Sequence, residues 1–192
     1  MSNQKENYLK KIKKYALENK IPIVRDDTLL FLQKVIDKIN ISNILEIGTA
    51  IGYSALGMSN EHNQIHTIER DYNKYQLALS FLKQGKFNIE FIWSEALFYH
   101  PRQKYDLIFI DIAKAQYIKV FQKYQFFLKK NGIIICDNLN FHNLDIQSLN
   151  ISRSTKRLIK KINDFKIFLK NNSTFDTLFL DIGDGLSFSV KK

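Results

Sequence analysis

The sequence predicts an α/β protein with a mostly parallel sheet that contains one antiparallel strand. From residue 43 onward, short apolar runs rich in Ile and aromatic residues alternate with helical stretches. Runs without polar alternation are typical of strands buried on both faces, and the helices between them join parallel neighbours. The last two apolar runs are separated only by Gly183-Asp184-Gly185, so they must pair as an antiparallel hairpin.

The first forty residues are predicted to form two helices, because apolar residues recur there at helical spacing. These residues are Leu9, Ile12, Ala16 and Leu17 in the first helix, and Leu29, Leu32, Val35, Ile36 and Ile39 in the second. Ile21-Pro22 ends the first helix, since a residue before proline disfavours helical backbone. Asp26 or Asp27 can cap the second.

The remaining elements follow in alternation. Strands are predicted at residues 44–47, 65–68, 89–93, 107–110, 133–136, 177–182 and 186–190, and helices at 52–60, 71–84, 95–99, 115–130 and 153–170. Asp71 is suited to cap the second of these helices, and Asn131-Gly132 to end the fourth. Because no repeat, linker or low-complexity tract divides the chain, residues 1–192 are expected to form a single domain.

The composition indicates a globular chain. Hydrophobic residues make up 45% and charged residues 25%, which argues against a disordered or fibrous protein. The apolar runs are too short to span a membrane, and the N-terminal segment has no apolar signal-peptide region. The single cysteine, Cys136, excludes an intramolecular disulfide. These features predict a cytoplasmic protein without a membrane partner.

The net charge of +10 is concentrated in two segments. Residues 1–20 carry six Lys and two Glu, residues 151–170 carry two Arg, five Lys and one Asp, and the rest of the chain is neutral. Concentrated positive charge favours a polyanionic partner such as nucleic acid. The chain is also rich in Lys, Asn and Ile, as AT-rich codon usage would produce, and the two explanations have equal weight on composition alone.

The first strand leads into a glycine turn, residues 46–52, which opens a helix. Gly48 permits a tight turn, and Gly52 lets the backbone approach a ligand closely. The pattern is E-x-G-x-x-x-G rather than the dinucleotide pattern G-x-G-x-x-G. A carboxylate at Glu46 would oppose a pyrophosphate, so the turn predicts a cationic or polar ligand instead.

Glu69 ends the second predicted strand. A carboxylate about 20 residues after a glycine turn is well placed to accept both hydroxyls of a ribose. The alternatives are that Glu69 caps the next helix or pairs with Arg70. Trp93, at the end of the third strand, is expected to pack in the core rather than contact a ligand.

Oxygen-bearing side chains and a lysine follow the fourth and fifth strands. Asp111 ends the fourth strand, Asp137 and Asn138 end the fifth, and Lys114 follows Asp111 closely. The carboxyl ends of parallel strands share one rim, so these side chains should converge there. Two carboxylates and an amide oxygen suit Mg²⁺, although each residue alone could instead form a turn or cap a helix.

These motifs together resemble a known family. E-I-G-T-A-x-G-Y-S, I-E-R, Y-D-L-I-F-I-D-x-A-K, C-D-N and I-G-D-G-L stand in the order and spacing of class I S-adenosylmethionine-dependent O-methyltransferases. The similarity is to the metal-dependent branch that includes catechol and caffeoyl-CoA methyltransferases. It implies a Rossmann-like fold with a seven-stranded sheet and helices on both faces. It also implies that residues 1–40 cover the active site of a core at 41–192, and that the protein is a homodimer.

The resemblance implies a role for each candidate residue. Lys114 would be the general base, and Asp111 would serve both cofactor and metal. Asp137 and Asn138 would complete the Mg²⁺ site. The other contacts to S-adenosyl-L-methionine would come from Val24, Glu46, Gly48, Ser54, Glu69, Glu95 and Ala96.

Within that branch, D-N-L-N-F-H at residues 137–142 resembles bacterial tRNA 5-hydroxyuridine methyltransferases, although Asn143 stands where glycine is usual. The implied reaction converts wobble 5-hydroxyuridine of tRNA into 5-methoxyuridine. The basic residues that could contact tRNA phosphates are Arg25, Arg153, Lys156 and Arg157. The alternatives are a small-molecule catechol or acyl-CoA O-methyltransferase, and a non-catalytic RNA-binding module.

Overall fold

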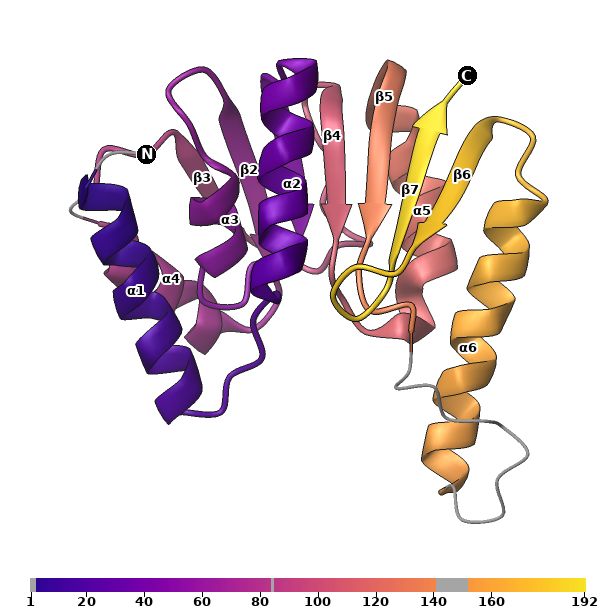
Figure 1. Ribbon diagram of the computed structural model, residues 1–192, viewed down its shortest axis with the longest axis horizontal. Coiled ribbons are helices and arrows are strands. Elements are labelled where there is room, and N and C mark those ends of the chain that lie inside the picture. The colour runs from indigo at the N-terminus through magenta and orange to yellow at the C-terminus, as the bar shows by residue number, and fades with distance from the viewer. Residues whose placement is uncertain (1–2, 84, 141–151) are drawn as a thin grey trace.

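The computed structural model describes residues 3–83, 85–140 and 152–192. Over these residues, seven strands form one sheet in the order β3-β2-β1-β4-β5-β7-β6 (Figure 1). The strands are β1 (Asn43–Ile47), β2 (Gln64–Glu69), β3 (Ile89–Trp93), β4 (Tyr105–Ile110), β5 (Leu128–Cys136), β6 (Phe175–Leu180) and β7 (Leu186–Lys191). β7 pairs antiparallel with both β5 and β6, while the pairs among β1 to β5 are parallel. The predicted sheet and its single reversed strand are confirmed.

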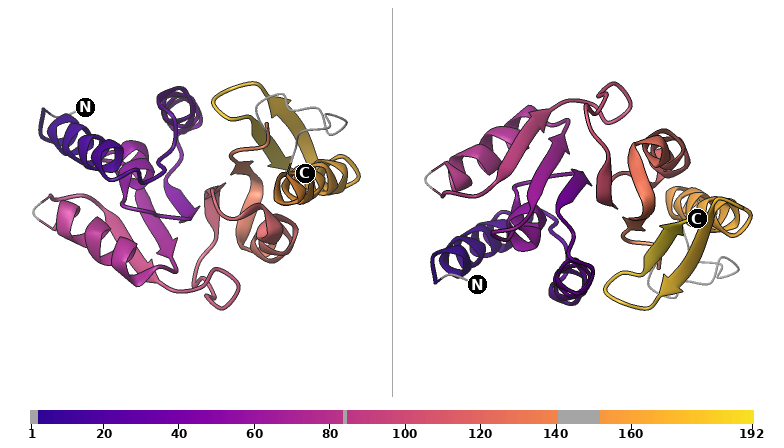
Figure 2. Two further views of the ribbon diagram at one scale, coloured as in Figure 1. Left: turned by 90° about the horizontal axis from the view of Figure 1, so that it is seen from below. Right: turned by 90° about the horizontal axis from the view of Figure 1, so that it is seen from above.

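Helices cover both faces of the sheet, as predicted (Figure 2). They are α1 (Asn3–Glu18), α2 (Asp26–Ile39), α3 (Tyr53–Met58), α4 (Tyr72–Leu82), α5 (Tyr117–Tyr124) and α6 (Arg153–Lys170), with short 3-10 turns η1 (Lys114–Gln116) and η2 (Gln125–Phe127) flanking α5. One core cluster joins α1, α2, α3 and part of α4 to the sheet, and the other joins α5 and α6 to the opposite face. Alternate residues of one strand, such as Ile44 and Leu45, enter different clusters, which explains the apolar runs.

The two N-terminal helices form as predicted, but the last apolar residue of each predicted face is exposed rather than buried. Ile12 and Ala16 are buried, whereas Leu17 is 69% exposed and Ile39, the last residue of α2, is 50% exposed. The predicted cap of α2 is wrong, because Arg25 occupies the N-cap position and its side chain makes no capping hydrogen bond to the helix. Both aspartates instead lie in the first turn, where the helix dipole still favours them. Asp71 does cap α4, as predicted, by accepting from the backbone amides of residues 73 and 74.

Two predicted helices between the later strands need correction. The helix predicted at 115–130 ends early, because β5 already begins at Leu128 and Asn131 adopts a positive φ of 60°. The register between β4 and β5 shifts at that point, so residues 129–132 form an irregularity in the strand rather than a helix end. The helix predicted at 95–99 is only a turn, and Pro101 disfavours helical backbone at the residue before it.

β3 also differs from the expectation of strands buried on both faces. It is an edge strand in which no residue is fully buried, and Trp93 at its end is 57% exposed rather than packed in the core. Among the residues that the structure describes, no helix is long and apolar enough to cross a membrane.

Candidate active site

The carboxyl ends of the parallel strands bring the predicted acidic residues to one rim of the sheet. The Asp111 amide donates to the Ile47 carbonyl at 2.9 Å, and the Asp137 amide donates to the Ile110 carbonyl at 3.1 Å. These bonds continue the ladders from β1 to β4 and from β4 to β5. Sequence reasoning from strand ends therefore predicted the convergence correctly.

The glycine turn packs directly on this rim. Gly48 has a φ of 106°, and a Cβ atom there would lie 2.0 Å from the Asp111 carbonyl oxygen. Its amide and that of Thr49 both donate to the Ile68 carbonyl, which fixes the turn against β2. Only glycine satisfies both the backbone conformation and the close approach at residue 48. Gly52, with a φ of 86°, precedes the first residue of α3.

Glu46 is fully buried beneath the turn. Burial raises the pKa of its carboxyl to about 7, although the nearby hydroxyls of Ser54 and Thr67 oppose the rise. Thr67 Oγ1 donates to Oε2, while Oε1 is buried without a hydrogen-bond partner among the described residues. A buried acceptor of this kind is unfavourable until a donor reaches it, so the site fits a ligand that carries an ammonium or hydroxyl group.

Glu69 connects the glycine turn to the end of β2. Its Oε2 accepts from the Ala50 amide and its Oε1 from the Asp71 amide, both at 2.8 Å. The two structural alternatives for this residue do not apply. Asp71 caps α4, and Arg70 pairs with Glu95 instead, with 3.5 Å between guanidinium nitrogen and carboxylate oxygen. A carboxylate that accepts two amides retains lone pairs for ribose hydroxyls.

The segment after β3 lies beside Glu69, because the Ser94 amide donates to the Glu69 carbonyl at 3.0 Å. Glu95 begins a turn there and Ala96 is buried within it. Val24 is buried in the core cluster just before α2, and Ser54 is buried in the first turn of α3. The structure therefore brings Glu46, Gly48, Ser54 and Glu69 to the glycine turn, with Glu95 and Ala96 following beside Glu69, whereas Val24 is buried in the core cluster before α2.

Asp111, Asp137 and Asn138 form a compact polar group. The Asn138 side-chain amide donates to Asp111 Oδ1 at 2.9 Å, and its backbone amide donates to Asp137 Oδ1 at 2.6 Å. Asn138 adopts a φ of 62°, and Tyr117 donates to the Asp137 carbonyl at 2.6 Å. Burial raises the pKa of Asp111, and burial together with the Asp111 charge raises the pKa of Asp137 to about 7.

A divalent cation would suit this group. Two buried carboxylates repel each other when both are ionised, and a cation between them reverses that penalty. Among the described residues, no three His, Cys, Asp or Glu side chains are close enough to hold a metal by themselves. A metal here would therefore depend on the amide oxygen of Asn138 as well as the two aspartates, a donor set that suits a hard cation.

Lys114 begins η1 and is half-buried over the Tyr117 ring, with 5.7 Å from Nζ to the ring centroid. Burial lowers the pKa of Lys114, while the charges of Asp111, Asp137 and Asp184 raise it. Asp184 was not singled out as a site residue from the sequence. The signal was its place in I-G-D-G-L, between two glycines with positive φ that shape the hairpin turn toward the rim.

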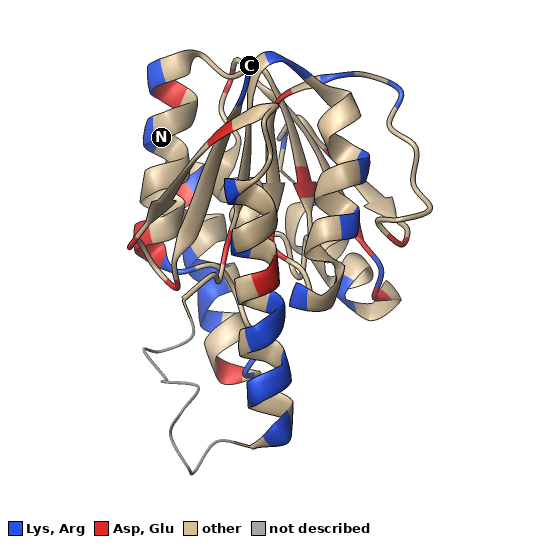
Figure 3. Ribbon diagram, turned by 90° about the vertical axis from the view of Figure 1, so that its right-hand side faces the viewer, with Lys and Arg blue, Asp and Glu red and all other residues tan. Residues whose placement is uncertain are grey.

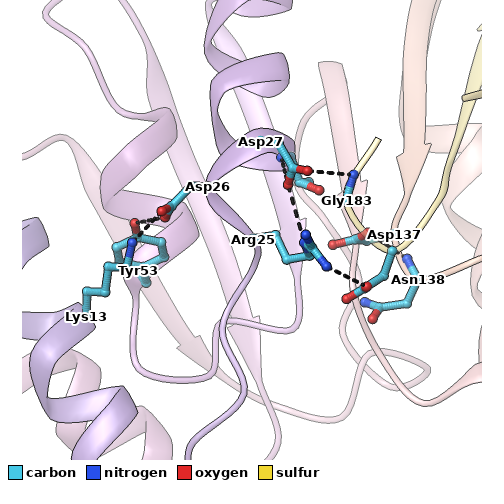
Figure 4. Close-up of polar contacts among 10 residues, drawn as sticks. Lys13, Arg25, Asp26, Asp27, Tyr53, Asp137, Asn138 and Gly183 are labelled. Atoms are coloured by element: carbon cyan, nitrogen blue, oxygen red, sulfur yellow. Dashed lines mark hydrogen bonds and ion pairs between the residues drawn. The ribbon is translucent and has the colours of Figure 1, made fainter. Parts of the chain in front are cut away.

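Figure 4 shows how the hairpin turn meets the segment before α2. Arg25 lies 3.4 Å from Asp184 and 3.6 Å from Asp27, measured between guanidinium nitrogens and carboxylate oxygens. The Gly183 amide donates to Asp27 Oδ2 at 3.2 Å. Arg25, predicted to contact tRNA, thus lies beside the rim but is already paired with two acids.

The other predicted tRNA-contacting residues lie on α6. Arg153, Lys156 and Arg157 are exposed in its first turns, and this end of α6 extends beyond the carboxyl ends of the parallel strands (Figure 1). Lys and Arg occur along much of the helix (Figure 3). The structure does not bring these three side chains into the acidic rim. Residues 141–143, which carry part of the predicted substrate loop, lie outside the described residues.

Two cavities lie elsewhere in the molecule. One of about 540 Å³ is lined by α4 and β3 residues, and one of about 650 Å³ by residues that include Lys5, Asp37 and Gly57. Neither is lined by a predicted site residue. The functional argument therefore rests on the rim and not on these cavities.

A Rossmann-like sheet with an acidic rim, a glycine turn and a terminal reversed hairpin defines the methyltransferase class of α/β proteins. Residues 1–192 match the O-methyltransferase family, and the chain belongs to that family. It is 32% identical over 174 residues to tapetum-specific methyltransferase 1 of Arabidopsis thaliana, with 84% of this chain and 74% of the relative covered.

Solved structures agree with the fold. The crystal structure of a candidate caffeoyl-CoA O-methyltransferase from Staphylococcus aureus is 34% identical, with a TM-score of 0.87 over 96% of this chain and 92% of the other. An O-methyltransferase from Bacillus cereus, solved in complex with SAH, has a TM-score of 0.81 at 22% identity, and the match covers 97% and 91% of the two chains. The second likeness shows the fold alone.

Proposed function

We propose that the protein transfers a methyl group from S-adenosylmethionine, with the help of Mg²⁺, to the 5-hydroxyl of wobble 5-hydroxyuridine in tRNA, giving 5-methoxyuridine. The observation that supports the methyl-transfer part is Glu46 Oε1, which is buried beneath the glycine turn and has no hydrogen-bond partner in the described part of the chain. A carboxylate at this point suits the ammonium of a methionine-like ligand, whereas a phosphate would be repelled.

The cofactor site follows from the rim. S-Adenosylmethionine supplies the methyl group on a positively charged sulfur, which favours carboxylates nearby. Glu46 accepts from the amino-acid part and Glu69 from the ribose hydroxyls, while Ala96 and Glu95 border the base. Gly48 leaves no side chain between the turn and Asp111, so the ligand can lie directly over the strand ends.

The acceptor site is formed by Asp111, Asp137, Asn138 and Lys114. A divalent cation held by the first three would lower the pKa of an acceptor hydroxyl and orient it for in-line displacement. Lys114 Nζ accepts the proton of that hydroxyl, because burial favours its neutral amine form. A 5-hydroxyuracil presents its hydroxyl beside the C4 carbonyl oxygen, so it can chelate as a catechol does.

The basic end of α6 supports an RNA acceptor. The acids lie at the strand ends, while the exposed Arg153, Lys156 and Arg157 project beyond them. Basic side chains suit the phosphate backbone of an RNA, and acidic side chains suit the positively charged sulfur of the methyl donor. An enzyme that binds both ligands needs the two kinds of charge in separate places. The positive charge that the sequence concentrates in residues 151–170 thus lies on α6, away from the acidic rim.

A second candidate function is a small-molecule O-methyltransferase for catechols or acyl-CoA thioesters. The similarity to caffeoyl-CoA O-methyltransferases favours it, including the Staphylococcus aureus protein at 34% identity. Both candidates use the same chemistry at the rim and differ only in what surrounds the acceptor. A third alternative, an RNA-binding module without catalysis, fits poorly with a complete set of acids and Lys114.

The test is single-turnover methylation with labelled S-adenosylmethionine, comparing hydroxyuridine-bearing tRNA, catechol and caffeoyl-CoA as acceptors. We expect incorporation into tRNA with Mg²⁺ and none with EDTA, and little competition from free catechol. Preferential methylation of catechol or caffeoyl-CoA would establish the second candidate. Cofactor binding without any methyl transfer, with Asp137→Ala behaving like the unmodified protein, would leave only the RNA-binding module.

A further inference from the structure

Lys123 of α5 donates three charged hydrogen bonds to backbone carbonyls of one short segment. Its Nζ donates to the carbonyls of Ala96, Leu97 and Tyr99, at 3.2, 2.7 and 2.6 Å. The neighbouring Tyr124, which is fully buried, donates its hydroxyl to the same Ala96 carbonyl at 2.7 Å. Two consecutive residues of α5 therefore hold one short stretch of backbone.

That stretch is a single isolated turn. The amides of Phe98 and Tyr99 both donate to the Glu95 carbonyl, at 3.0 and 3.1 Å, and no helix continues from there. The carbonyls of such a turn have no following amides to satisfy them. Lys123 supplies the missing donors, because one ammonium can donate three hydrogen bonds and its charge favours the carbonyl end of a turn.

The turn matters because of what it borders. Ser94 is bonded to the Glu69 carbonyl, and Arg70 pairs with Glu95, so the 95–99 turn is anchored beside the ribose acid on one side. Lys123 and Tyr124 of α5, which shares a core cluster with Ala96, anchor its other side. Ala96, at the centre, is the residue whose backbone both side chains fix.

We propose that Lys123, assisted by Tyr124, is a positioning residue that sets the adenine end of the cofactor site by capping the 95–99 turn. Lys123 does not contact the ligand and acts only through the backbone of Ala96 and its neighbours. This inference rests on the proposed cofactor site at Glu69 and Ala96. Lys123 is only partly buried and lies beside the buried face of α5, which Tyr117, Val120, Phe121 and Tyr124 form, so its ammonium can reach the turn from the edge of the helix.

The test uses S-adenosylhomocysteine as probe and Trp93 as reporter, since Trp93 is the single tryptophan of the chain and lies just before the turn. The variants are Lys123→Met, Lys123→Arg and Tyr124→Phe. Lys119→Met is the matched control, because Lys119 lies one turn earlier on α5 and is exposed. Fluorescence titration gives Kd, and methyl transfer at saturating acceptor gives KM for the methyl donor and kcat.

We expect Lys123→Met to raise Kd and KM about tenfold while kcat stays near that of the unmodified protein, the scale of losing charged hydrogen bonds. Lys123→Arg should recover most of the affinity, Tyr124→Phe should raise Kd about threefold, and Lys119→Met should change nothing. General destabilisation would instead lower kcat, through loss of active protein, with KM unchanged.

An unchanged Kd in folded Lys123→Met, or in Tyr124→Phe should the first variant fail to fold, would overturn the inference while leaving the proposed function intact. Absence of S-adenosylhomocysteine binding by the unmodified protein would overturn both. The two failures are therefore distinguishable.

Discussion

The guanidinium Nη1 of Arg25 lies 3.4 Å from Oδ1 of Asp184, a residue 159 positions further along the chain. The pair connects the segment before α2 to the hairpin turn between β6 and β7 beside the acidic rim. Arg25 is 57% exposed and Asp184 33% exposed in their side chains, so water screens the attraction.

A double-mutant cycle measures this connection. We expect Arg25→Ala and Asp184→Asn to show a coupling in unfolding free energy below about 1 kcal/mol, as for exposed ion pairs. If Arg25 also contacts tRNA, Arg25→Ala should weaken tRNA binding further in the Asp184→Asn background. If Asp184→Asn and the double variant bind tRNA with equal affinity, Arg25 does not contact the RNA.

The buried carboxyl of Glu46 predicts a pH-dependent stability of the ligand-free protein. Its pKa is raised in the folded state to about 7 from 4.5, so the folded state resists ionisation. Stability is therefore fullest below the unfolded value and falls as the pH rises from about 4.5 to 7. Glu46→Gln should remove that fall, worth at most about 3 kcal/mol, in urea melts across this range.

The same variant should fail to bind ligand well, because an amide cannot balance an ammonium. We expect Glu46→Gln to raise the Kd of S-adenosylhomocysteine at least tenfold at pH 7.5. Glu46→Gln should therefore be more stable than the unmodified protein at pH 7.5 and yet bind S-adenosylhomocysteine more weakly. A variant that is neither more stable at pH 7.5 nor weaker in binding would contradict the role given to Oε1.

Asp137→Asn tests the metal site. The substitution removes one of two buried carboxyls, and burial together with the Asp111 charge raises the pKa of Asp137 to about 7. We expect the metal-free variant to be more stable than the unmodified protein at pH 8, and its Mg²⁺ binding and methyl transfer to be lost. Calorimetric titration with Mg²⁺ checks the first loss independently of activity. Normal Mg²⁺ affinity in the variant would place the metal elsewhere.

Gly48→Ala tests the contact between the glycine turn and β4. A Cβ at this residue would lie 2.0 Å from the backbone oxygen of Asp111, and φ is 106°. We expect a loss of about 3 kcal/mol or more, the sum of backbone strain and overpacking. Gly52→Ala is the matched control, since its φ is also positive but its nearest atom, at 3.3 Å, is the end of the Leu82 side chain. Equal thermal shifts for the two variants would show that the Asp111 contact is unimportant.

The basic end of α6 predicts salt-dependent RNA binding. Replacing both Lys156 and Arg157 with Gln should lower the slope of log affinity against log salt by roughly 2, about one for each phosphate contact. Replacing Lys34 and Lys38 of α2 with Gln removes the same charge from another exposed helix face and should leave the slope unchanged. A similar change of slope in both variants would indicate net charge rather than contacts made by α6.

The parts of the fold that repeat a local pattern could be predicted from the sequence. The strands of the inner sheet, the terminal hairpin and the acids at strand ends follow from periodicity and from the rule that carboxyl ends share a rim. The acids converge in the structure, as at Asp111 and Asp137. Their catalytic roles remain predictions.

Other features depend on contacts distant in sequence and could not be predicted. Trp93 is exposed because β3 lies at the sheet edge, which strand order determines and residue type does not. β5 replaces the end of a predicted helix because pairing with β4 outweighs helical preference there. The carbonyl cap formed by Lys123 joins residues more than 20 positions apart, and nothing in its local sequence indicates it.

The position of β7 between β5 and β6 has a consequence for assembly. β6 touches the sheet only through β7, and the hairpin turn bonds back to Leu139 and Asn140 through the carbonyls of Gly185 and Asp184. Strands β1 to β5 can pair without them, whereas the hairpin turn that carries Asp184 is held beside the rim by the pairing of residues 186–191 with β5. That pairing joins segments about 55 residues apart and must wait for the hairpin, so we expect it to form late in folding. The glycine turn and the acids at the ends of β4 and β5 would thus be organised before the hairpin turn brings Asp184 to the rim.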